Sequence, residues 1–276
     1  MQVNISILVE NTTPIPALTG EYGFSALISI DGRKILFDTG SADALFHNAR
    51  QMGIKLEEVS DLLISHGHFD HTSGMLALCS DFGGKRIFTH PNIFADKSIL
   101  SSRGDIRKIG VPFSKQELLD AGAEFVFVDK FCEILPGVFI SGEIPRKNEF
   151  EDTGGNFRIQ AGNELVVDEL LDDMALIIDH PDGLIIVSGC AHAGIINTID
   201  YACKMTSRSK ILAFVGGTHL INASEERMSR TISAIKEMDI EKIAVGHCTG
   251  FYAAARLYNE LGSRLVKADT GMTFRF

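Results

Sequence analysis

The feature that most constrains how this chain can fold is a short segment, residues 62–74, in which an apolar run meets a cluster of metal-binding side chains. Leu62, Leu63 and Ile64 form the apolar run, which ends abruptly at polar residues, as a buried strand does where it enters a loop. Four residues of the types that bind metal ions follow within six positions: His66, His68, Asp70 and His71. Because α/β folds present reactive groups where their strands end, the segment predicts an α/β protein with a metal site at a strand end.

The spacing within the cluster suits two ions rather than one. Two histidines separated by one residue on an extended loop, here His66 and His68, can turn their imidazoles to the same side and bind one ion. Asp70 and His71 lie immediately beyond and can face a second ion about 3.5–4 Å from the first, the usual separation in two-metal sites. One such histidine alone would more often be a capped or solvated residue, whereas four ligand-type residues at this spacing predict a binuclear site.

Strand and helix patterns alternate along the chain in two similar halves. The expected strands cover residues 3–10, 24–30, 34–37, 62–64, 86–89, 124–128, 138–140, 175–178, 184–187, 211–215 and 243–245, with two more near the end. The expected helices cover residues 42–52, 71–79, 114–122, 194–204, 224–238 and 252–261. This order predicts an α/β fold with αββα layers, in which two mixed sheets pack face to face with helices outside, over a single domain of residues 1–276.

Residues 142–167 interrupt this alternation. They are polar, contain Pro145 and several glycines, and have no sustained periodicity. Because strand patterns resume on both sides, we interpret the segment as a long functional loop or lid inserted in the domain rather than as a linker.

Composition and charge narrow the range of partners. The net charge is −10 at pH 7, which counts against a nucleic acid as a partner because phosphate backbones select basic surfaces. No stretch approaches the ~18 consecutive apolar residues of a membrane span, and the chain begins without the basic and apolar regions of a signal peptide. Five cysteines without CxxC spacing do not indicate a disulfide framework. We therefore expect a cytoplasmic protein that acts on a small molecule, and the sequence leaves its oligomeric state open.

The histidine cluster resembles a family motif. The letters HGHFDH at residues 66–71 resemble the HxHxDH motif of the metallo-β-lactamase superfamily, and Phe-Asp-Thr-Gly at residues 37–40 is similar to its strand-end Asp-Thr-Gly segment. The resemblance implies two divalent metal ions, zinc first, with manganese and iron as alternatives. It assigns His66 and His68 to one ion and Asp70 and His71 to the other, with Asp70 also orienting the attacking hydroxide. Asp38 would stand behind the histidines and hold them; the alternative is a helix N-cap or turn residue.

The resemblance also implies ligands later in the chain. His247 follows an apolar strand and matches the family's final strand-end histidine, and His192 lies in a small-residue loop after another strand. Many relatives carry a bridging Asp at the position of Cys190. Cys190 either replaces that Asp as a thiolate ligand, or fills a small buried space, or leaves the role to His192. The family's usual third histidine has no clear counterpart in residues 141–146.

Other polar residues are assigned to the substrate or to solvent. His219 follows a strand and two glycines that let a ligand approach the backbone, so we expect it to act on or bind the substrate rather than a metal. Arg146, in the lid segment, suits a substrate phosphate. The glutamates of that segment suit hydrogen bonds to a pterin ring, or else form a solvated charged loop: Glu143, Glu149 and Glu151. We expect His47 and His180 to be solvated, and His90 to face either a pocket or the surface.

Short sequence motifs along the chain narrow the resemblance to one branch of the superfamily. They occupy residues 23–28, 65–68, 142–146, 188–194, 216–220 and 246–250. Together they resemble the dihydropterin-methyl-ribofuranosylaminobenzene-phosphate synthase-like branch, over residues 3–274. That resemblance implies a metal-dependent enzyme that acts on a small phosphorylated molecule. One reaction that it implies is the condensation after which the branch is named, which joins a dihydropterin to an aminobenzene ribose-phosphate.

Several alternatives stay open at this point. The same site would also suit hydrolysis of a phosphoester or a lactone. A mononuclear iron oxidoreductase of the same fold is a further alternative, whereas a diiron reductase would normally add a flavin domain for which no residues remain. A nuclease is disfavoured by the acidic charge. A non-catalytic binding protein is disfavoured because the HxHxDH cluster is complete.

Overall fold

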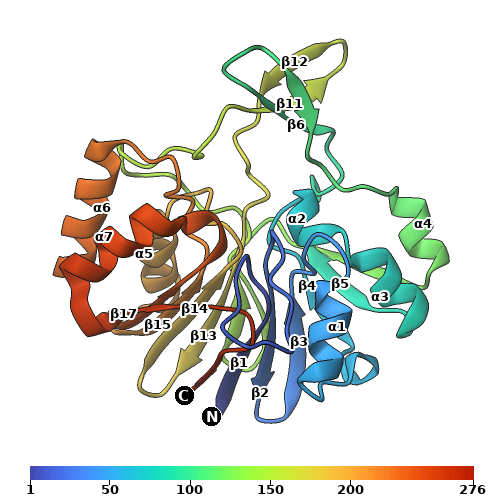
Figure 1. The fold of residues 1–276 in the computed structure, drawn as a ribbon, viewed down its shortest axis with the longest axis horizontal. Helices are drawn as coiled ribbons and strands as arrows, with labels where there is room; N and C mark the ends of the chain where they lie inside the picture. The colour runs from blue at the N-terminus through green and yellow to red at the C-terminus, as the bar shows by residue number, and fades with distance from the viewer. The chain divides into compact units, whose positions relative to one another are not determined.

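The chain builds two seven-stranded sheets, and its last strand, Thr273–Arg275, belongs to the same sheet as its first (Figure 1). The computed structural model describes all residues, 1–276, and the chain forms two compact units. The first unit comprises Met1–Val128, Arg158–Val167 and Asp269–Phe276, and the second comprises Asp129–Phe157 and Asp168–Ala268. The predicted mixture of sheets and helices is confirmed.

The sheet of the first unit has the strand order β18-β1-β2-β3-β4-β5-β8. Its strands are β1 (Val3–Val9), β2 (Ser25–Ile30), β3 (Arg33–Phe37), β4 (Asp61–Leu63), β5 (Arg86–Thr89), β8 (Glu124–Phe127) and β18 (Thr273–Arg275). β2 and β3 form the hairpin expected around Asp31-Gly32, whereas β3, β4, β5 and β8 are parallel. The parallel strands therefore end at one edge, where Asp38 follows β3 and His66 follows β4.

Helices cover this sheet through an apolar core. They are α1 (Ala44–Gln51), η1 (Leu56–Glu58), α2 (Phe69–Thr72), α3 (Met75–Asp81) and α4 (Lys115–Asp120). Leu45, Leu62 and Leu78 belong to one buried cluster. The single helix expected over residues 71–79 is instead two helices, α2 and α3, which meet at Gly74. A Cβ atom at Gly74 would lie 2.7 Å from the carbonyl oxygen of Thr39, so the chain bends where it passes that backbone.

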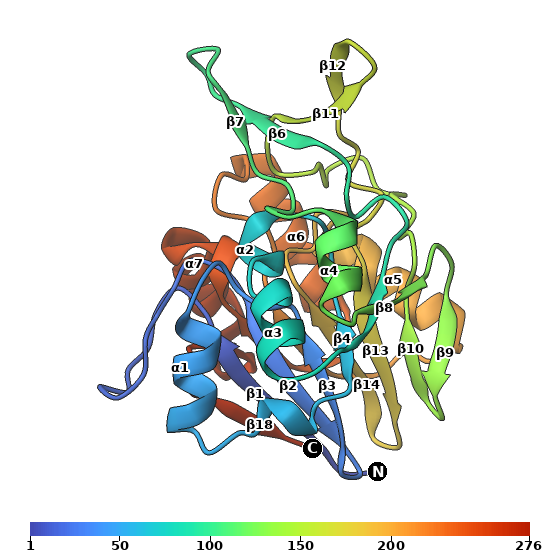
Figure 2. The same cartoon turned by 90° about the vertical axis from the view of Figure 1, so that its right-hand side faces the viewer.

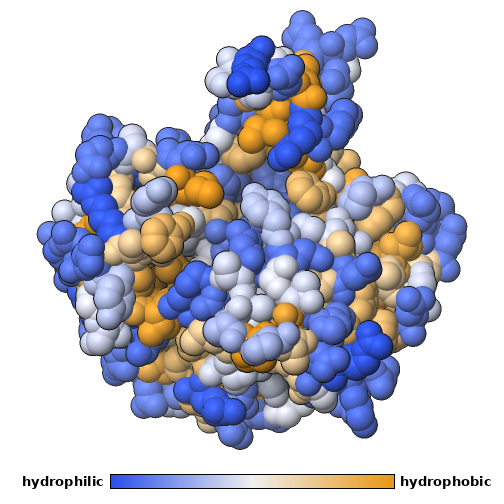
Figure 3. Space-filling view, viewed as in Figure 1, coloured by the Kyte–Doolittle hydropathy of each residue, from blue (hydrophilic) through white to orange (hydrophobic).

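Four short strands of the first unit form a separate small sheet in the order β12-β11-β6-β7 (Figure 2). They are β6 (Lys97–Leu100), β7 (Ile106–Lys108), β11 (Phe157–Ala161) and β12 (Glu164–Val167). The sequence prediction missed all four, including the hairpin in the lid segment. Apolar residues of this sheet, among them Ile106 and Val167, stay exposed, so no alternation of buried and polar residues marks the strands. Figure 3 shows apolar surface in the region at the top of the view, where Figure 1 draws this sheet.

The sheet of the second unit has the strand order β17-β16-β15-β14-β13-β10-β9. Its strands are β9 (Cys132–Leu135), β10 (Val138–Ile140), β13 (Ala175–His180), β14 (Gly183–Ser188), β15 (Ile211–Gly216), β16 (Ile240–Val245) and β17 (Leu265–Lys267). β14, β15, β16 and β17 are parallel neighbours. The carboxyl ends of β14, β15 and β16 consequently share one edge, and each leads into a loop that carries a predicted site residue.

Three helices pack on one face of the second sheet: α5 (Ile195–Thr206), α6 (Glu225–Glu237) and α7 (Phe251–Leu261). Two short 3₁₀ turns flank α7, η2 (His247–Thr249) and η3 (Gly262–Arg264). Side chains such as Ile199, Ile232 and Leu257 meet Ile186 and Phe214 in one buried cluster. No helix of the protein has both the length and the apolar character needed to cross a bilayer.

Candidate metal centre

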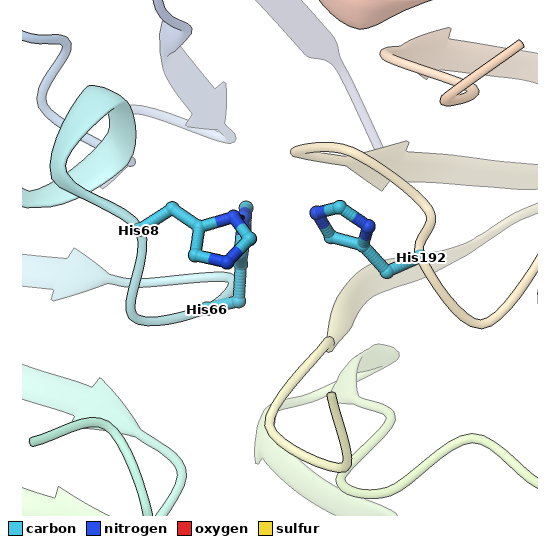
Figure 4. Close-up of side chains that lie close together, drawn as sticks. All are labelled: His66, His68 and His192. Carbon is cyan, nitrogen blue, oxygen red and sulfur yellow. Dashed lines mark hydrogen bonds between the residues drawn. The ribbon is translucent and has the colours of Figure 1, made fainter. Parts of the chain in front are cut away.

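The loop after β4 buries the predicted cluster of the first unit. His66, His68, Asp70 and His71 are all buried. The Nε2 atom of His66 and the Nδ1 atom of His68 lie 2.9 Å apart, and the two rings make an angle of 77°. Figure 4 shows these two side chains leaving the same loop, with His192 on the loop that follows β14. The two ring nitrogens of the first unit are thus close enough to bind one ion.

The buried carboxylate of Asp38 fixes this loop through hydrogen bonds. Asp38 is fully buried, and its Oδ2 atom accepts hydrogen bonds from Nδ1 of His71 and from the Ser65 hydroxyl, both at 2.7 Å. Its Oδ1 atom accepts from the backbone N–H of Ser65, also at 2.7 Å. The Ser65 hydroxyl lies 2.9 Å from Nδ1 of His66. Because a carboxylate only accepts, Nδ1 of His71 carries the proton and Nε2 keeps its lone pair for a metal. The structure therefore places Asp38 in the predicted supporting position.

Backbone contacts leave no room for larger residues in the loop. A Cβ atom at Gly67, between the two histidines, would lie 2.3 Å from the carbonyl oxygen of Ile93. The N–H of Phe69 donates to the carbonyl of Ile109 at 2.9 Å. These contacts hold the loop against residues 93–109, so its histidines are fixed by packing as well as by Asp38.

In the second unit, three adjacent strand ends bring ligand-type side chains together. Cys190 and His192 follow β14, His219 follows β15, and His247 follows β16. Ligand atoms of Cys190, His192 and His219 lie within 4.8 Å of one another, and so do those of Cys190, His247 and Cys248. The parallel order of the strands explains this grouping, since their carboxyl ends share an edge.

Several backbones at these strand ends have the left-handed conformation that side chains rarely adopt. The φ angles are +52° at Ala191, +45° at His219, +52° at His247 and, in the first unit, +57° at Asp38. Such conformations are unfavourable for residues other than glycine and concentrate at functional sites. Their occurrence at four predicted site loops supports a functional role for these loops.

The lid segment supplies an acceptor for His192. Its Nδ1 atom lies 2.8 Å from the carbonyl oxygen of Thr153, which can only accept, so Nδ1 is protonated and Nε2 keeps the lone pair. The rings of His192 and His219 have centroids 4.2 Å apart, and Phe157 packs edge-on against both. A Cβ atom at Gly154 would lie 2.1 Å from Nδ1 of His219. The segment thus packs directly on the two histidines.

Two carboxylates fasten this segment to helices. Glu151 accepts hydrogen bonds at 2.9 Å from the backbone N–H groups of Ile196 and Asn197, at the start of α5. Burial raises the pKa of Glu151 despite these bonds. Asp152 accepts from Nη1 of Arg227, a side chain that is only 2% exposed. The carboxylate of Glu151 is therefore engaged by α5, in contrast to the solvated or pterin-binding role considered from the sequence.

Arg146 lies beside His192. Its Nη2 atom donates to the carbonyl oxygen of His192 at 3.3 Å, and its Nη1 atom lies 3.6 Å from the carboxylate of Glu169. The buried Nε atom of Arg146 makes no hydrogen bond within the chain. The arginine chosen from the sequence thus reaches the loop that carries a predicted ligand.

Two further residues of this region were not singled out from the sequence. Burial raises the pKa of the Cys248 thiol, but a hydrogen bond with Cys190 and the charges of His247 and His219 outweigh it, so that the pKa lies well below its usual range. Burial raises the pKa of Asp173 to about 7, and this carboxylate accepts from the N–H of Ala193 at 2.8 Å. The adjacency of Cys248 to a strand-end histidine was a usable signal, whereas Asp173 carried none.

The remaining histidines lie outside these groups. His180, predicted to be solvated, is buried, and its Nδ1 atom accepts from the N–H of Asp182 at 3.2 Å. That prediction was wrong because the turn folds back on the ring. His90 is also buried, and its Nδ1 atom accepts from the N–H of Asn92 at 3.1 Å, which is a turn contact. His47 is half-buried and lies 2.9 Å from the carbonyl oxygen of Ala17.

The donor set fits divalent metal ions. Neutral imidazoles, a carboxylate and a thiol suit zinc, and imidazole with carboxylate also suits manganese or iron. In His71 and His192 the hydrogen bond at Nδ1 leaves Nε2 available as a ligand, which is the usual arrangement behind metal-binding histidines. The residues present therefore match the chemistry that the predicted cluster requires.

Comparisons with known proteins identify the family of the chain. Residues 18–247 match the family model described as the metallo-beta-lactamase superfamily. The chain is 33% identical over 270 residues to the 7,8-dihydropterin-6-methyl-4-(beta-D-ribofuranosyl)-aminobenzene-5'-phosphate synthase of Methanocaldococcus jannaschii, covering 93% of this chain and 90% of the relative. It is 24% identical over 262 residues to the exodeoxyribonuclease WalJ of Streptococcus pneumoniae, covering 94% of this chain and 90% of the relative.

Solved structures show the same fold. A metal-dependent hydrolase of the β-lactamase superfamily superposes with a TM-score of 0.85 at 28% identity, covering 99% of this chain and 98% of the other. Zinc-bound PqqB from Methylobacterium extorquens superposes with a TM-score of 0.61 at 14% identity, covering 98% and 99% of the two chains, which supports the fold alone. The motif, the fold and these matches lead to one conclusion: the chain belongs to the metallo-β-lactamase superfamily.

Proposed function

We propose that this protein is a binuclear metal-dependent enzyme that acts on a small phosphorylated molecule. The proposed ligands of the two ions are His66, His68, Asp70 and His71 from the first unit and Cys190, His192 and His247 from the second. The observation that carries the proposal is the buried cluster after β4, in which Nε2 of His66 and Nδ1 of His68 lie 2.9 Å apart. Histidine nitrogens are common zinc ligands, and the buried carboxylate of Asp70 and the imidazole of His71 follow in the same loop, which supports a metal site here.

Bound divalent ions would polarise an oxygen of the substrate and lower the pKa of water at the site. Around them, the chain's own residues orient the reactants. Asp70, the carboxylate of the cluster, has its Oδ2 atom 3.6 Å from Nε2 of His71 and is proposed to orient the attacking group. His219 is proposed to bind or protonate the substrate. Arg146, with its Nε atom making no hydrogen bond in the chain, is proposed to bind the phosphate.

Two reaction types are compatible with these residues. The relative from Methanocaldococcus jannaschii is named as a synthase of a dihydropterin-aminobenzene phosphate, which supports a condensation. The solved relative at 28% identity is described as a hydrolase, which supports hydrolysis of a phosphoester or a lactone instead. We propose the condensation first, because the synthase has the higher sequence identity to this chain, 33% against 28% for the hydrolase.

Metal content per chain tests the number and kind of ions. Protein purified without chelators and without a nickel column should contain close to two equivalents of zinc or manganese by plasma mass spectrometry. A single equivalent of iron would contradict the binuclear proposal and would favour the alternative of a mononuclear iron oxidoreductase.

Substitution of one ligand tests the assignment. His68→Ala should lose bound metal and activity while its circular dichroism spectrum stays unchanged. His47→Ala is the matched control, because His47 lies on α1, outside the cluster. Retention of the full metal content by His68→Ala would refute the proposed ligand set.

A further inference from the structure

Helix α7 begins with two aromatic side chains that the fold leaves in solvent. Phe251 is 77% exposed and Tyr252 is 87% exposed. The buried face of the same helix consists of Ala253, Leu257 and Leu261. The two rings therefore lie off the face that holds α7 on its sheet, and they contribute little to the core.

Exposure of this kind needs an explanation. Aromatic side chains bury more apolar area than other residues when they pack, and phenylalanine has no polar atom that gains from water. The rings of Phe251 and Tyr252 contact each other edge to face, with centroids 5.5 Å apart and an interplanar angle of 72°. This contact orients the pair and leaves ring surface open for a further partner.

A third exposed apolar side chain stands beside the pair. Ile221 is 53% exposed, and its N–H donates to the carbonyl of Cys248 at 3.2 Å. Gly250, which precedes Phe251, has a φ angle of +74°, and a Cβ atom there would lie 2.7 Å from Cγ1 of Ile221. The glycine thus lets the start of α7 approach Ile221 closely.

The position of this patch connects it with the candidate metal centre. Ile221 lies two residues after His219, and Phe251 lies four residues after His247. The patch therefore stands at the carboxyl edge of β15 and β16, where both histidines emerge. Tyr258, the other exposed aromatic residue of α7 at 58% exposure, lies two turns along the helix from Phe251.

We propose that Ile221, Phe251 and Tyr252 form a subsite that binds a planar aromatic ring of the substrate. This inference rests on the proposed function, because it places the subsite beside the proposed metal ligands. Three apolar side chains are few for a stable protein interface. A ring is the occupant we choose, because the relative from Methanocaldococcus jannaschii is named for a product that contains a dihydropterin and an aminobenzene. An edge-to-face pair also offers the geometry in which a further ring can stack.

Binding of isolated ring compounds tests the subsite without turnover. The chain contains no tryptophan, so the fluorescence of 6-hydroxymethylpterin can be followed without interference from that residue. The double variant Phe251→Leu/Tyr252→Leu should weaken pterin binding, and binding of 4-aminobenzoate by calorimetry, by about five- to tenfold. Ribose 5-phosphate, which lacks an aromatic ring, should bind both proteins equally. Tyr258→Leu is the matched control and should bind all three compounds as the wild type does.

Several results would overturn the inference. Unchanged pterin and aminobenzoate affinity in the double variant, an equal loss in Tyr258→Leu, or absence of ring binding by the wild type would do so. A dimer that light scattering finds in the wild type but not in the double variant would show that the patch binds a second copy. Metal content is measured on the same samples. If the wild type contains no metal but binds the ring compounds in a way that depends on Phe251, the proposed function is refuted and the proposed subsite is retained.

Discussion

Replacing Asp38 by asparagine tests how far the loop after β4 depends on one buried carboxylate. Asparagine has nearly the same shape and tolerates the φ angle of +57°, so the backbone should not change. The carboxylate accepts three hydrogen bonds at 2.7 Å, from the N–H and hydroxyl of Ser65 and from Nδ1 of His71. An amide has one oxygen, so at least one donor would face an N–H₂ group.

The size of the effect follows from those bonds. Hydrogen bonds to a charged group contribute about 1 kcal/mol more than neutral ones, and an unsatisfied buried donor costs about 1–3 kcal/mol. We therefore expect Asp38→Asn to lower the free energy of unfolding of the metal-free protein by about 2–4 kcal/mol. Because Asp38 also fixes the protonated nitrogen of His71, metal affinity should fall about 10- to 100-fold.

The assays are urea denaturation of the metal-free protein and competition with a chromophoric chelator for zinc. Asp43→Asn is the control, since Asp43 precedes α1 without a side-chain capping bond. If Asp38→Asn lowers stability but binds zinc with wild-type affinity, Asp38 supports only the fold. If neither quantity changes, the argument from buried hydrogen bonds is wrong.

Three further substitutions concern the second unit. Glu151→Ala removes the acceptor for two N–H groups of α5 and should lower the free energy of unfolding by about 2–4 kcal/mol. Because burial raises the pKa of Glu151, the folded wild type binds a proton on this carboxyl more tightly than the unfolded chain does. The free energy of unfolding of the wild type should therefore fall as the pH rises from about 4.5 through the raised pKa. Urea titrations at a series of pH values should show no such fall in the variant. Gly154→Ala, with its Cβ atom directed at His219, should impair activity far more than Gly162→Ala, where φ is also positive but space is open. Cys190→Ser should weaken zinc binding at least tenfold by chelator competition, and unchanged affinity would assign Cys190 to packing.

The strand-end cluster was predictable because its information is local. Residues 66–71 include four residues of the types that bind metal ions, and the apolar run before them identifies a buried strand. Both the site and the strand can therefore be predicted from neighbouring residues in the sequence. Asp38 was reached only through the family resemblance. Its role depends on β3 lying parallel to β4, a pairing of residues about 25 positions apart that no local pattern specifies.

The missed features share a physical cause. β6, β7, β11 and β12 are short and keep apolar residues exposed, so the alternation that identifies a half-buried strand is absent. The burial of His180 depends on the turn that folds back on its ring. Asp173 accepts a hydrogen bond from the N–H of Ala193 because the loop after β14 folds back on it, which again is a contact between distant segments. In each case the decisive partner lies far along the chain or outside a regular pattern.

The proposed lid, residues 142–167, contacts His192 at two places, so we expect it to link substrate binding to the proposed metal ligands. Thr153 accepts from Nδ1 of His192, and Arg146, the proposed phosphate ligand, donates to the carbonyl of the same histidine. Because Glu151 and Asp152 hold the segment on α5 and α6, a movement that let Arg146 follow a phosphate would pull on the acceptor of His192. Changes in this segment that alter substrate preference should therefore also alter metal affinity.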